Sequence, residues 1–293
     1  MNKYIKCLAL LLPLAAFSFV VETPYETSIK SWQQKRIENL KSEEGWLNLA
    51  GLFWLEEGEN TIGGDKKNSI VFPADHSAPF IGKIILKKGQ ITFEAAPNAV
   101  VLQGNDPILE TTLFPYNGFK PTVLKHKTLR WFIIQRGDKY AIRLRDLEGE
   151  YLLGFKGIET FPINEAWKVK TRFVPTEGKK LSITDITGRT YEQDSPGKLV
   201  FTLDGKEYSL AATGKKERLH VVFSDATSKH ETYGAGRFLD AEAPDAEGNI
   251  YLDFNKAYNP PCAFTPYATC PLPVKENQLT VAIKAGEKYS GNH

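Results

Sequence analysis

The side chains best suited to chemistry lie between residues 223 and 259. Arg237 follows a glycine and precedes Phe-Leu, so we expect its guanidinium to be buried. A buried charge without a partner is costly in a low dielectric. The partner is either an internal carboxylate, from Asp225, Glu231 or Asp253, or the carboxylate or phosphate of a ligand held in the guanidinium fork. The sequence leaves both alternatives open.

This cluster supports two functional hypotheses. In the first, the protein is a metal-independent hydrolase of a small anionic molecule. Arg237 anchors the anion, one of the three carboxylates transfers protons, and Tyr258 or Asn255 polarises an oxygen. In the second, an envelope protein binds a small molecule or partner without catalysis, or the same residues form an internal structural network. The other candidate ligand-binding residues are Tyr233, Asn259 and Arg143.

Arg143 lies in a segment, residues 139–145, whose side chains alternate between apolar and polar. Tyr140, Ile142 and Leu144 face one way, which is typical of a half-buried strand. Arg143 then lies on the polar face, where we expect it to be solvated. The alternative is that it reaches into a cleft shared with Arg237.

The sequence lacks the familiar cofactor and metal motifs. Gly234-Ala235-Gly236-Arg237 misses the third glycine of a dinucleotide fingerprint, and no Walker loop, Gly-x-Ser-x-Gly elbow or His-Glu-x-x-His occurs. One acidic loop does not match EF-hand spacing, so a solvated hairpin tip is favoured over a calcium site. Its residues are Asp240, Glu242, Asp245 and Glu247. We expect neither metal nor cofactor. Three histidines without visible partners are expected in the core or on the surface: His76, His126 and His293.

A proline-rich segment, residues 253–273, holds five prolines and two cysteines. Proline fixes φ and removes a backbone donor, so the segment is neither helix nor regular strand. Its aromatic residues nevertheless predict a packed segment that lines a site or plugs the fold. We refer to it below as the Pro/Cys segment.

Cys262 and Cys270 are expected to form a disulfide if the chain is exported. The bond would close a nine-residue loop and stabilise the fold by about 2–3 kcal/mol. The alternatives are two reduced buried thiols, a metal site, for which the spacing is too wide, and a nucleophilic Cys262 served by a histidine.

The N-terminal residues predict export to the periplasm or the extracellular space. Two lysines precede an uncharged apolar run that ends near Val21 and is shorter than a spanning helix, as in a secretory signal peptide. Loss of Lys3 and Lys6 from 37 basic residues would leave 35, equal to the 35 acidic residues. A near-neutral mature chain without a second apolar run is expected to bind neither nucleic acid nor membranes.

The elements that must position these side chains are mainly strands. One helix is expected from Thr27 to Glu44, ended by Gly45 in a left-handed cap. Short apolar runs follow, separated by hairpin turns at Lys88-Gly89, Gly137-Asp138 and Asp204-Gly205. We predict a mainly β protein: a signal peptide over residues 1–21, the helix within 22–45, a small β-sandwich over 46–118, and a larger antiparallel β unit over 119–293.

The small sandwich loosely resembles a forkhead-associated domain, on the run Gly51-Leu-Phe-Trp-Leu55, Thr61-Ile-Gly-Gly64 and Ser69-Ile-Val-Phe-Pro73. That family binds phosphothreonine through a loop arginine, and Gly64 stands where the arginine is expected. The resemblance therefore implies the fold and no phosphopeptide binding.

Most of the mature chain resembles the bacterial and archaeal family called domain of unknown function 1684. The matching blocks are Gly45–Leu55, Arg136-Gly137 with Arg143–Asp146, Thr232–Leu239, Asp253–Cys262, Cys270–Pro273, Glu276-Asn277 and Ala285–Glu287. Ala235 replaces a glycine of the third block. The resemblance marks positions and implies no activity, ligand or residue role.

Overall fold

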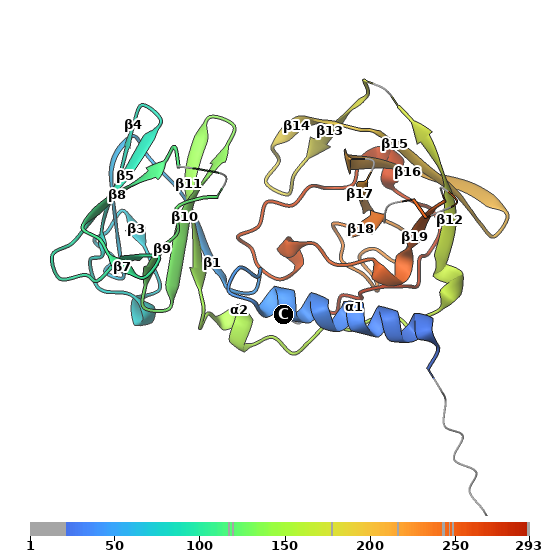
Figure 1. Cartoon of the computed structure of the whole chain (residues 1–293), viewed down its shortest axis with the longest axis horizontal. Coiled ribbons are helices and arrows are strands. Elements are labelled where there is room, and N and C mark those ends of the chain that lie inside the picture. The colour runs from blue at the N-terminus through green and yellow to red at the C-terminus, as the bar shows by residue number, and fades with distance from the viewer. Residues whose placement is uncertain are drawn as a thin grey trace, which may run out of the picture.

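The computed structural model describes residues 22–291, apart from 117, 119, 177, 216, 242, 243, 246 and 248. The signal peptide predicted for residues 1–21 lies outside the described residues, as do Glu242 and His293. The described chain is mainly β, as predicted, with a helix near its beginning and sheets that are almost entirely antiparallel (Figure 1).

The first β unit is a sandwich of a six-stranded and a five-stranded sheet. The strand orders are β1-β11-β10-β9-β6-β7 and β3-β2-β4-β5-β8. The elements of this unit are β1 (Leu49–Trp54), β2 (Gly58–Gly63), β3 (Ile70–Val71), η1 (Ala74–His76), β4 (Gly82–Lys87), β5 (Gln90–Ala95), β6 (Leu102–Gln103), β7 (Asp106–Pro107), β8 (Glu110–Phe114), β9 (Leu124–His126), β10 (Leu129–Arg136) and β11 (Lys139–Asp146).

The sandwich core lies between the two sheets and centres on Trp131, which is completely buried. Its ring packs edge-on against Phe72, at 5.7 Å, and Phe93, at 5.9 Å. Ile142 and Leu144 of β11 belong to the same core, as their alternation with polar residues predicts. The opposite face of β11 therefore carries the arginines.

The sandwich extends further than predicted. The predicted boundary at residue 118 falls between β8 and β9, inside the unit. β11 pairs with β1 from Leu49 opposite Arg145 to Trp54 opposite Ala141, so the first strand of the unit needs its last strand as a partner. The unit therefore ends at Asp146, because the sheet is complete only there.

The second β unit is built on one six-stranded sheet, with the order β18-β17-β16-β15-β12-β19, and a separate hairpin of β13 and β14. Phe254 lies at its centre, with the rings of Phe201 and Phe223 at 5.6 and 5.7 Å. The elements are α2 (Glu150–Leu153), η2 (Glu165–Trp167), β12 (Lys168–Pro175), β13 (Lys180–Thr184), β14 (Thr190–Asp194), β15 (Gly197–Leu203), β16 (Lys206–Lys215), β17 (Arg218–Phe223), β18 (Arg237–Ala241), β19 (Ile250–Asp253), η3 (Phe254–Lys256), η4 (Pro261–Ala263) and η5 (Lys275–Asn277).

The helix α1 spans Pro24–Lys41 and runs along the second unit (Figure 1). It begins three residues earlier than predicted because Thr23 and Glu26 form a capping box. It ends at Lys41 with an extended Ser42, so Gly45 is not its left-handed cap. Gly45 is needed for close approach instead: a Cβ there would lie 2.1 Å from the Leu40 carbonyl oxygen.

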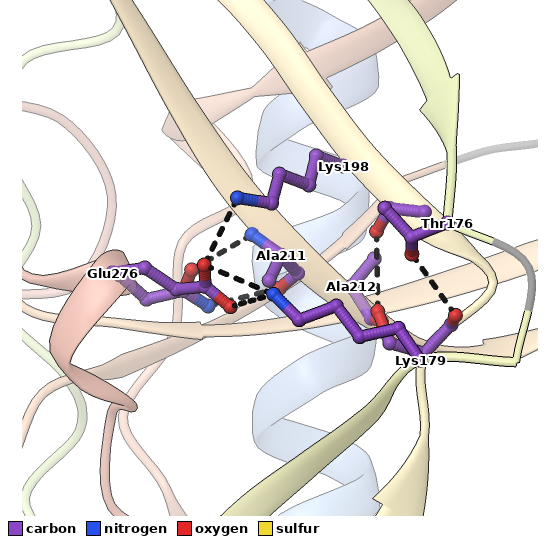
Figure 2. A network of polar contacts seen from close by, with 9 residues as sticks. Thr176, Lys179, Lys198, Ala211, Ala212 and Glu276 are labelled. Atoms are coloured by element: carbon purple, nitrogen blue, oxygen red, sulfur yellow. Dashed lines mark hydrogen bonds and ion pairs between the residues drawn. The ribbon is translucent and has the colours of Figure 1, made fainter.

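A polar clamp fastens η5 to the sheet of the second unit. Figure 2 shows Lys179 and Lys198 converging on the Glu276 carboxylate, at 3.1 and 2.9 Å. Burial alone would raise the pKa of Glu276, but the two lysines outweigh it and hold the pKa below its usual range. Asn277 next to it is buried, and its side-chain amide accepts from the Ala211 N–H at 2.7 Å through Oδ1 and donates to the Ala211 carbonyl at 2.9 Å through Nδ2. The Glu276-Asn277 block is therefore structural.

Candidate functional site

Arg237, the predicted anion anchor, makes an internal network. It lies at the start of β18 with 1% of its surface exposed. Its Nη2 donates to Asp225 Oδ2 at 2.7 Å and to the Ile283 carbonyl at 3.0 Å, and Nη1 donates to the Ala285 carbonyl. Burial lowers the pKa of Arg237, and the Asp225 carboxylate opposes this shift. The guanidinium thus joins β18 to the last part of the chain.

Asp225 is fully engaged in the same network. Its Oδ1 accepts from the Thr227 amide at 2.7 Å, while Oδ2 holds Arg237. Glu231 lies apart on the surface, where it pairs with Lys284 at 3.2 Å. The structure therefore brings one of the three predicted carboxylates to Arg237.

Asp253 belongs to a different network, which anchors the start of α1. Its Oδ1 accepts from the Tyr25 hydroxyl at 2.9 Å and from the Asn255 amide at 3.2 Å. The Asn255 side chain also holds both backbone groups of Asn164, at 2.8 and 3.0 Å. Burial, together with Asp253, raises the pKa of Tyr25. All of these contacts are internal to the protein.

Tyr258 and Asn259 dock the middle of α1. Arg36 stacks 4.7 Å from the centre of the Tyr258 ring and donates from Nη2 to the Asn259 carbonyl at 2.8 Å. Its Nε pairs at 3.1 Å with Glu287, whose other carboxylate oxygen accepts from the Asn259 amide at 2.7 Å. Burial raises the pKa of Glu287, and Arg36 opposes the shift. The sequence analysis missed Arg36, which carries no motif, and gave Glu287 no role.

The two cysteines are free thiols in the structure, so the predicted disulfide is not formed there. They lie side by side, with the Cys262 amide 3.1 Å from Cys270 Sγ. A hydrogen bond from the Cys270 thiol lowers the pKa of Cys262. Tyr233 donates from its hydroxyl to the Cys262 carbonyl at 3.1 Å, which places this candidate ligand-binding residue in the packing of the Pro/Cys segment.

Arg143 corrects our expectation of a solvated side chain, because only 5% of its surface is exposed. It lies on β11 with its guanidinium carbon 5.7 Å from the centre of the Trp46 ring. Within the described residues, its Nε and Nη2 are inaccessible to water and have no hydrogen-bond partner. Burial lowers its pKa to about 10, and Arg136 and Arg145 add to the effect. Arg143 lies on β11 of the first unit and Arg237 on β18 of the second, where Asp225 and backbone carbonyls hold the Arg237 guanidinium.

Arg145, on the same face of β11, differs from Arg143 because its guanidinium has hydrogen-bond partners. Its Nη1 donates to the Gly45 carbonyl and, at 2.8 Å, to Asn48 Oδ1. Among the arginines that the structure describes, Arg143 alone has both Nε and Nη2 buried without a hydrogen-bond partner, whereas Arg237 lacks a partner only at Nε. Alternation predicted the face on which Arg143 lies, but nothing in the local sequence predicts that Trp46 covers it.

Histidine positions also differ from expectation. His76 was expected to have no partner, yet its Nδ1 contacts Asp146 Oδ2. His126 accepts from the Ala78 amide at 3.1 Å through Nε2, so it is a buried structural residue. His76 and Asp146 line a pocket that is described below.

These features define a class: a mainly β protein of two units, with a helix docked on the second unit and a buried arginine, unpaired at Nε and Nη2, on the sheet of the first. The model of the family described as "Protein of unknown function (DUF1684)" matches residues 153–288, and the chain belongs to this family. The match includes the blocks around Arg237 and the Pro/Cys segment, while the blocks at residues 45–55 and 136–146 lie outside it.

The chain is similar to one solved structure in particular. This is the solution structure of an uncharacterised protein from gene locus rrnAC0354 of Haloarcula marismortui, with 32% identity and a TM-score of 0.40. The alignment covers 47% of this chain and 80% of that one. None of the curated proteins matches the sequence.

Proposed function

We propose that the protein binds a small anionic ligand and that Arg143, whose Nε and Nη2 are covered in this structure, anchors it once the Trp46 side chain moves aside. The observation that carries the proposal is the burial of this guanidinium with Nε and Nη2 unpaired. These two nitrogens form one edge of the guanidinium, and two parallel N–H groups on one edge match the two oxygens of a carboxylate or phosphate. Arg136 and Arg145 add positive charge nearby.

The cost of burying Arg143 supports a functional role. An ionised group in a low dielectric destabilises the fold unless it is paired. The Trp46 ring contributes a cation–π contact of modest size. A charge kept at some expense of stability is typical of functional sites.

Binding is favoured here over hydrolysis. A hydrolase would need an acid–base group beside the anion. The three predicted carboxylates make their contacts with Arg237, Lys284 and Tyr25 instead. The non-catalytic alternative of the sequence analysis is therefore the function we propose.

Thermal unfolding tests the proposal. In the absence of ligand, Arg143→Met should be more stable than wild type by about 0.5–2 kcal/mol, because an unpaired buried charge is replaced by an apolar chain of similar length. Acetate, citrate and phosphate should be screened as sodium salts at constant ionic strength. At least one should raise the melting temperature of the wild type in a saturable way and leave that of Arg143→Met unchanged.

Arg145→Met is the matched control, because it removes an arginine from the same strand face but breaks two hydrogen bonds. It should lower the melting temperature and keep the response to the anion. The proposal fails if Arg143→Met is markedly destabilised, or if it responds to the anion as the wild type does.

We further propose that the protein is exported and that its cysteines are then oxidised. The support is the basic and apolar pattern of residues 1–21, which lie outside the described residues, and the proximity of the two thiols. No helix in the described part of the chain is long and apolar enough to span a membrane.

Protein purified from the periplasm or medium should begin near residue 22 and contain no free thiol. Its intact mass without reductant should be lower by two hydrogen atoms, and reduction should destabilise it by about 2–3 kcal/mol. Cys262→Ser with Cys270→Ser should lose the response to reductant. Two reactive thiols in the exported protein would contradict the disulfide, and retention of residues 1–21 would contradict cleavage.

A further inference from the structure

A pocket with a volume of about 330 Å³ lies where the sandwich meets the Pro/Cys segment. Arg143 does not line it, so it is a different place from the site proposed above. Pockets of this volume are at the lower end of the range that holds small molecules. The lining residues that the inference uses are Asp75, His76, Asp146, Glu148, Glu150, Tyr151 and Tyr267.

The pocket contains a fixed imidazole–carboxylate pair. Asp146 ends β11 with its side chain almost completely buried, and it contacts His76 Nδ1 through Oδ2. Its Oδ1 accepts from the Glu148 amide at 3.1 Å, so both carboxylate oxygens are held. The bond at Nδ1 fixes the ring and leaves Nε2, on its far side, as the nitrogen available to a ligand.

The charge of the wall is strongly negative. Four carboxylates line the pocket, from Asp75, Asp146, Glu148 and Glu150, and no lysine or arginine is among the lining residues. His76 is the single basic group. Such a wall attracts cations.

Two aromatic rings complete the wall. Tyr151, from α2, and Tyr267, from the Pro/Cys segment, pack edge to face with their centres 6.4 Å apart. Aromatic faces beside carboxylates are the usual surroundings of organic ammonium groups. Within the described residues, no group of three or more His, Cys, Asp or Glu side chains could hold a metal ion.

We propose that this pocket binds a small organic ammonium ion and that a proton on His76 competes with it. The ammonium contacts the carboxylates and the tyrosine rings, and it is bound best when the imidazole is neutral. Proton and ligand are thus coupled, and by linkage each weakens the binding of the other.

The direction of the pH dependence follows from the groups around His76. The hydrogen bond that His76 Nδ1 donates to the Asp146 carboxylate raises the pKa of His76, burial opposes the shift, and the charges of Asp146, Glu148 and Asp75 add to the rise. Below this pKa the imidazolium neutralises Asp146 and repels an ammonium ion. As pH rises through the pKa, the imidazole loses its charge and affinity increases, by at most tenfold per pH unit for one proton.

Isothermal titration of the full chain tests the inference with ethylammonium, 1,4-diammoniobutane and tetramethylammonium chlorides at pH 6 and pH 8. At least one should bind, about tenfold more tightly at pH 8. His76→Gln should bind equally at both pH values, with the affinity at pH 6 raised to about that of wild type at pH 8. Asp146→Asn should lose affinity, but it removes a buried anchor of the fold.

Glu148→Gln with Glu150→Gln is therefore the decisive variant, because both side chains are exposed and the fold does not depend on them. It should bind the ammonium at least fivefold more weakly at pH 8. Glu192→Gln, on exposed β14, is the control that should bind as wild type does. The inference is overturned if no ammonium salt binds at pH 8, if the double variant binds unchanged, or if magnesium or calcium chloride binds in preference.

Discussion

Replacement of Arg237 by glutamine should lower the free energy of unfolding by about 3–5 kcal/mol, because removal of one partner leaves the other charge buried and unpaired. Asp225 is as deeply buried as Arg237, and 2.7 Å separates the paired atoms. The substitution also leaves backbone carbonyls of residues 283 and 285 without a donor. Urea unfolding monitored by tryptophan fluorescence measures the loss.

Arg218→Gln provides the comparison, because this arginine lies on the neighbouring strand with 80% of its side chain exposed. Its effect should stay within about 0.5 kcal/mol. A melting temperature of Arg237→Gln equal to or above that of wild type would refute the structural role and return Arg237 to the ligand-binding candidates.

Gly236→Ala should be almost as damaging, with a loss of about 3 kcal/mol or more. The φ of Gly236 is +91°, a conformation that side chains other than glycine rarely adopt. An added Cβ would lie 2.5 Å from the Phe223 carbonyl oxygen and 2.6 Å from Pro273 Cγ. Both neighbours are parts of the fold with little freedom to move, so backbone strain and overlap add.

Gly234→Ala is the matched control two residues earlier in the same motif. Its backbone is not in the left-handed region, and the nearest atom to an added Cβ is Lys229 Cγ at 3.1 Å, in a flexible side chain. We expect a change within about 0.5 kcal/mol by the same urea titration. Equal effects of the two substitutions would show that the conformation of Gly236 is not what the motif requires.

Turns and helix ends were predictable from the sequence wherever residues that are neighbours in the chain determine the local backbone conformation. The turns at Lys88-Gly89, Gly137-Asp138 and Asp204-Gly205 are confirmed, since each joins two paired strands. Positive φ values at Lys88 and Gly89 show why such pairs are favoured in hairpins. The start of α1 was predictable too, from Thr23 and Glu26 at capping-box spacing, although the sequence analysis placed it at Thr27.

Contacts between distant segments were not predictable in this way. Alternation along β11 indicates two faces but not what covers each, so Arg143 was assigned to solvent and Trp46 was overlooked. His76 and Asp146 lie 70 residues apart, and neither is flanked by a motif. The extent of the sandwich depends on the pairing of β1 with β11. Neither the alternation of side chains nor the turn residues indicate that these two distant strands are partners.

The docking of α1 has a consequence for the order in which the chain can fold. Arg36 of α1 and its partner Glu287 are 251 residues apart in the sequence. The Arg36 guanidinium therefore stays unpaired until Glu287 has been synthesised. Contacts of such long range are slow to form, because a large loop must close first. Leu40 belongs to a cluster with Ala263 and Phe264, so until these residues are made it lacks its final packing and remains available to chaperones and proteases. A nascent chain arrested before this point should therefore be cleaved more readily within α1 than the full-length protein.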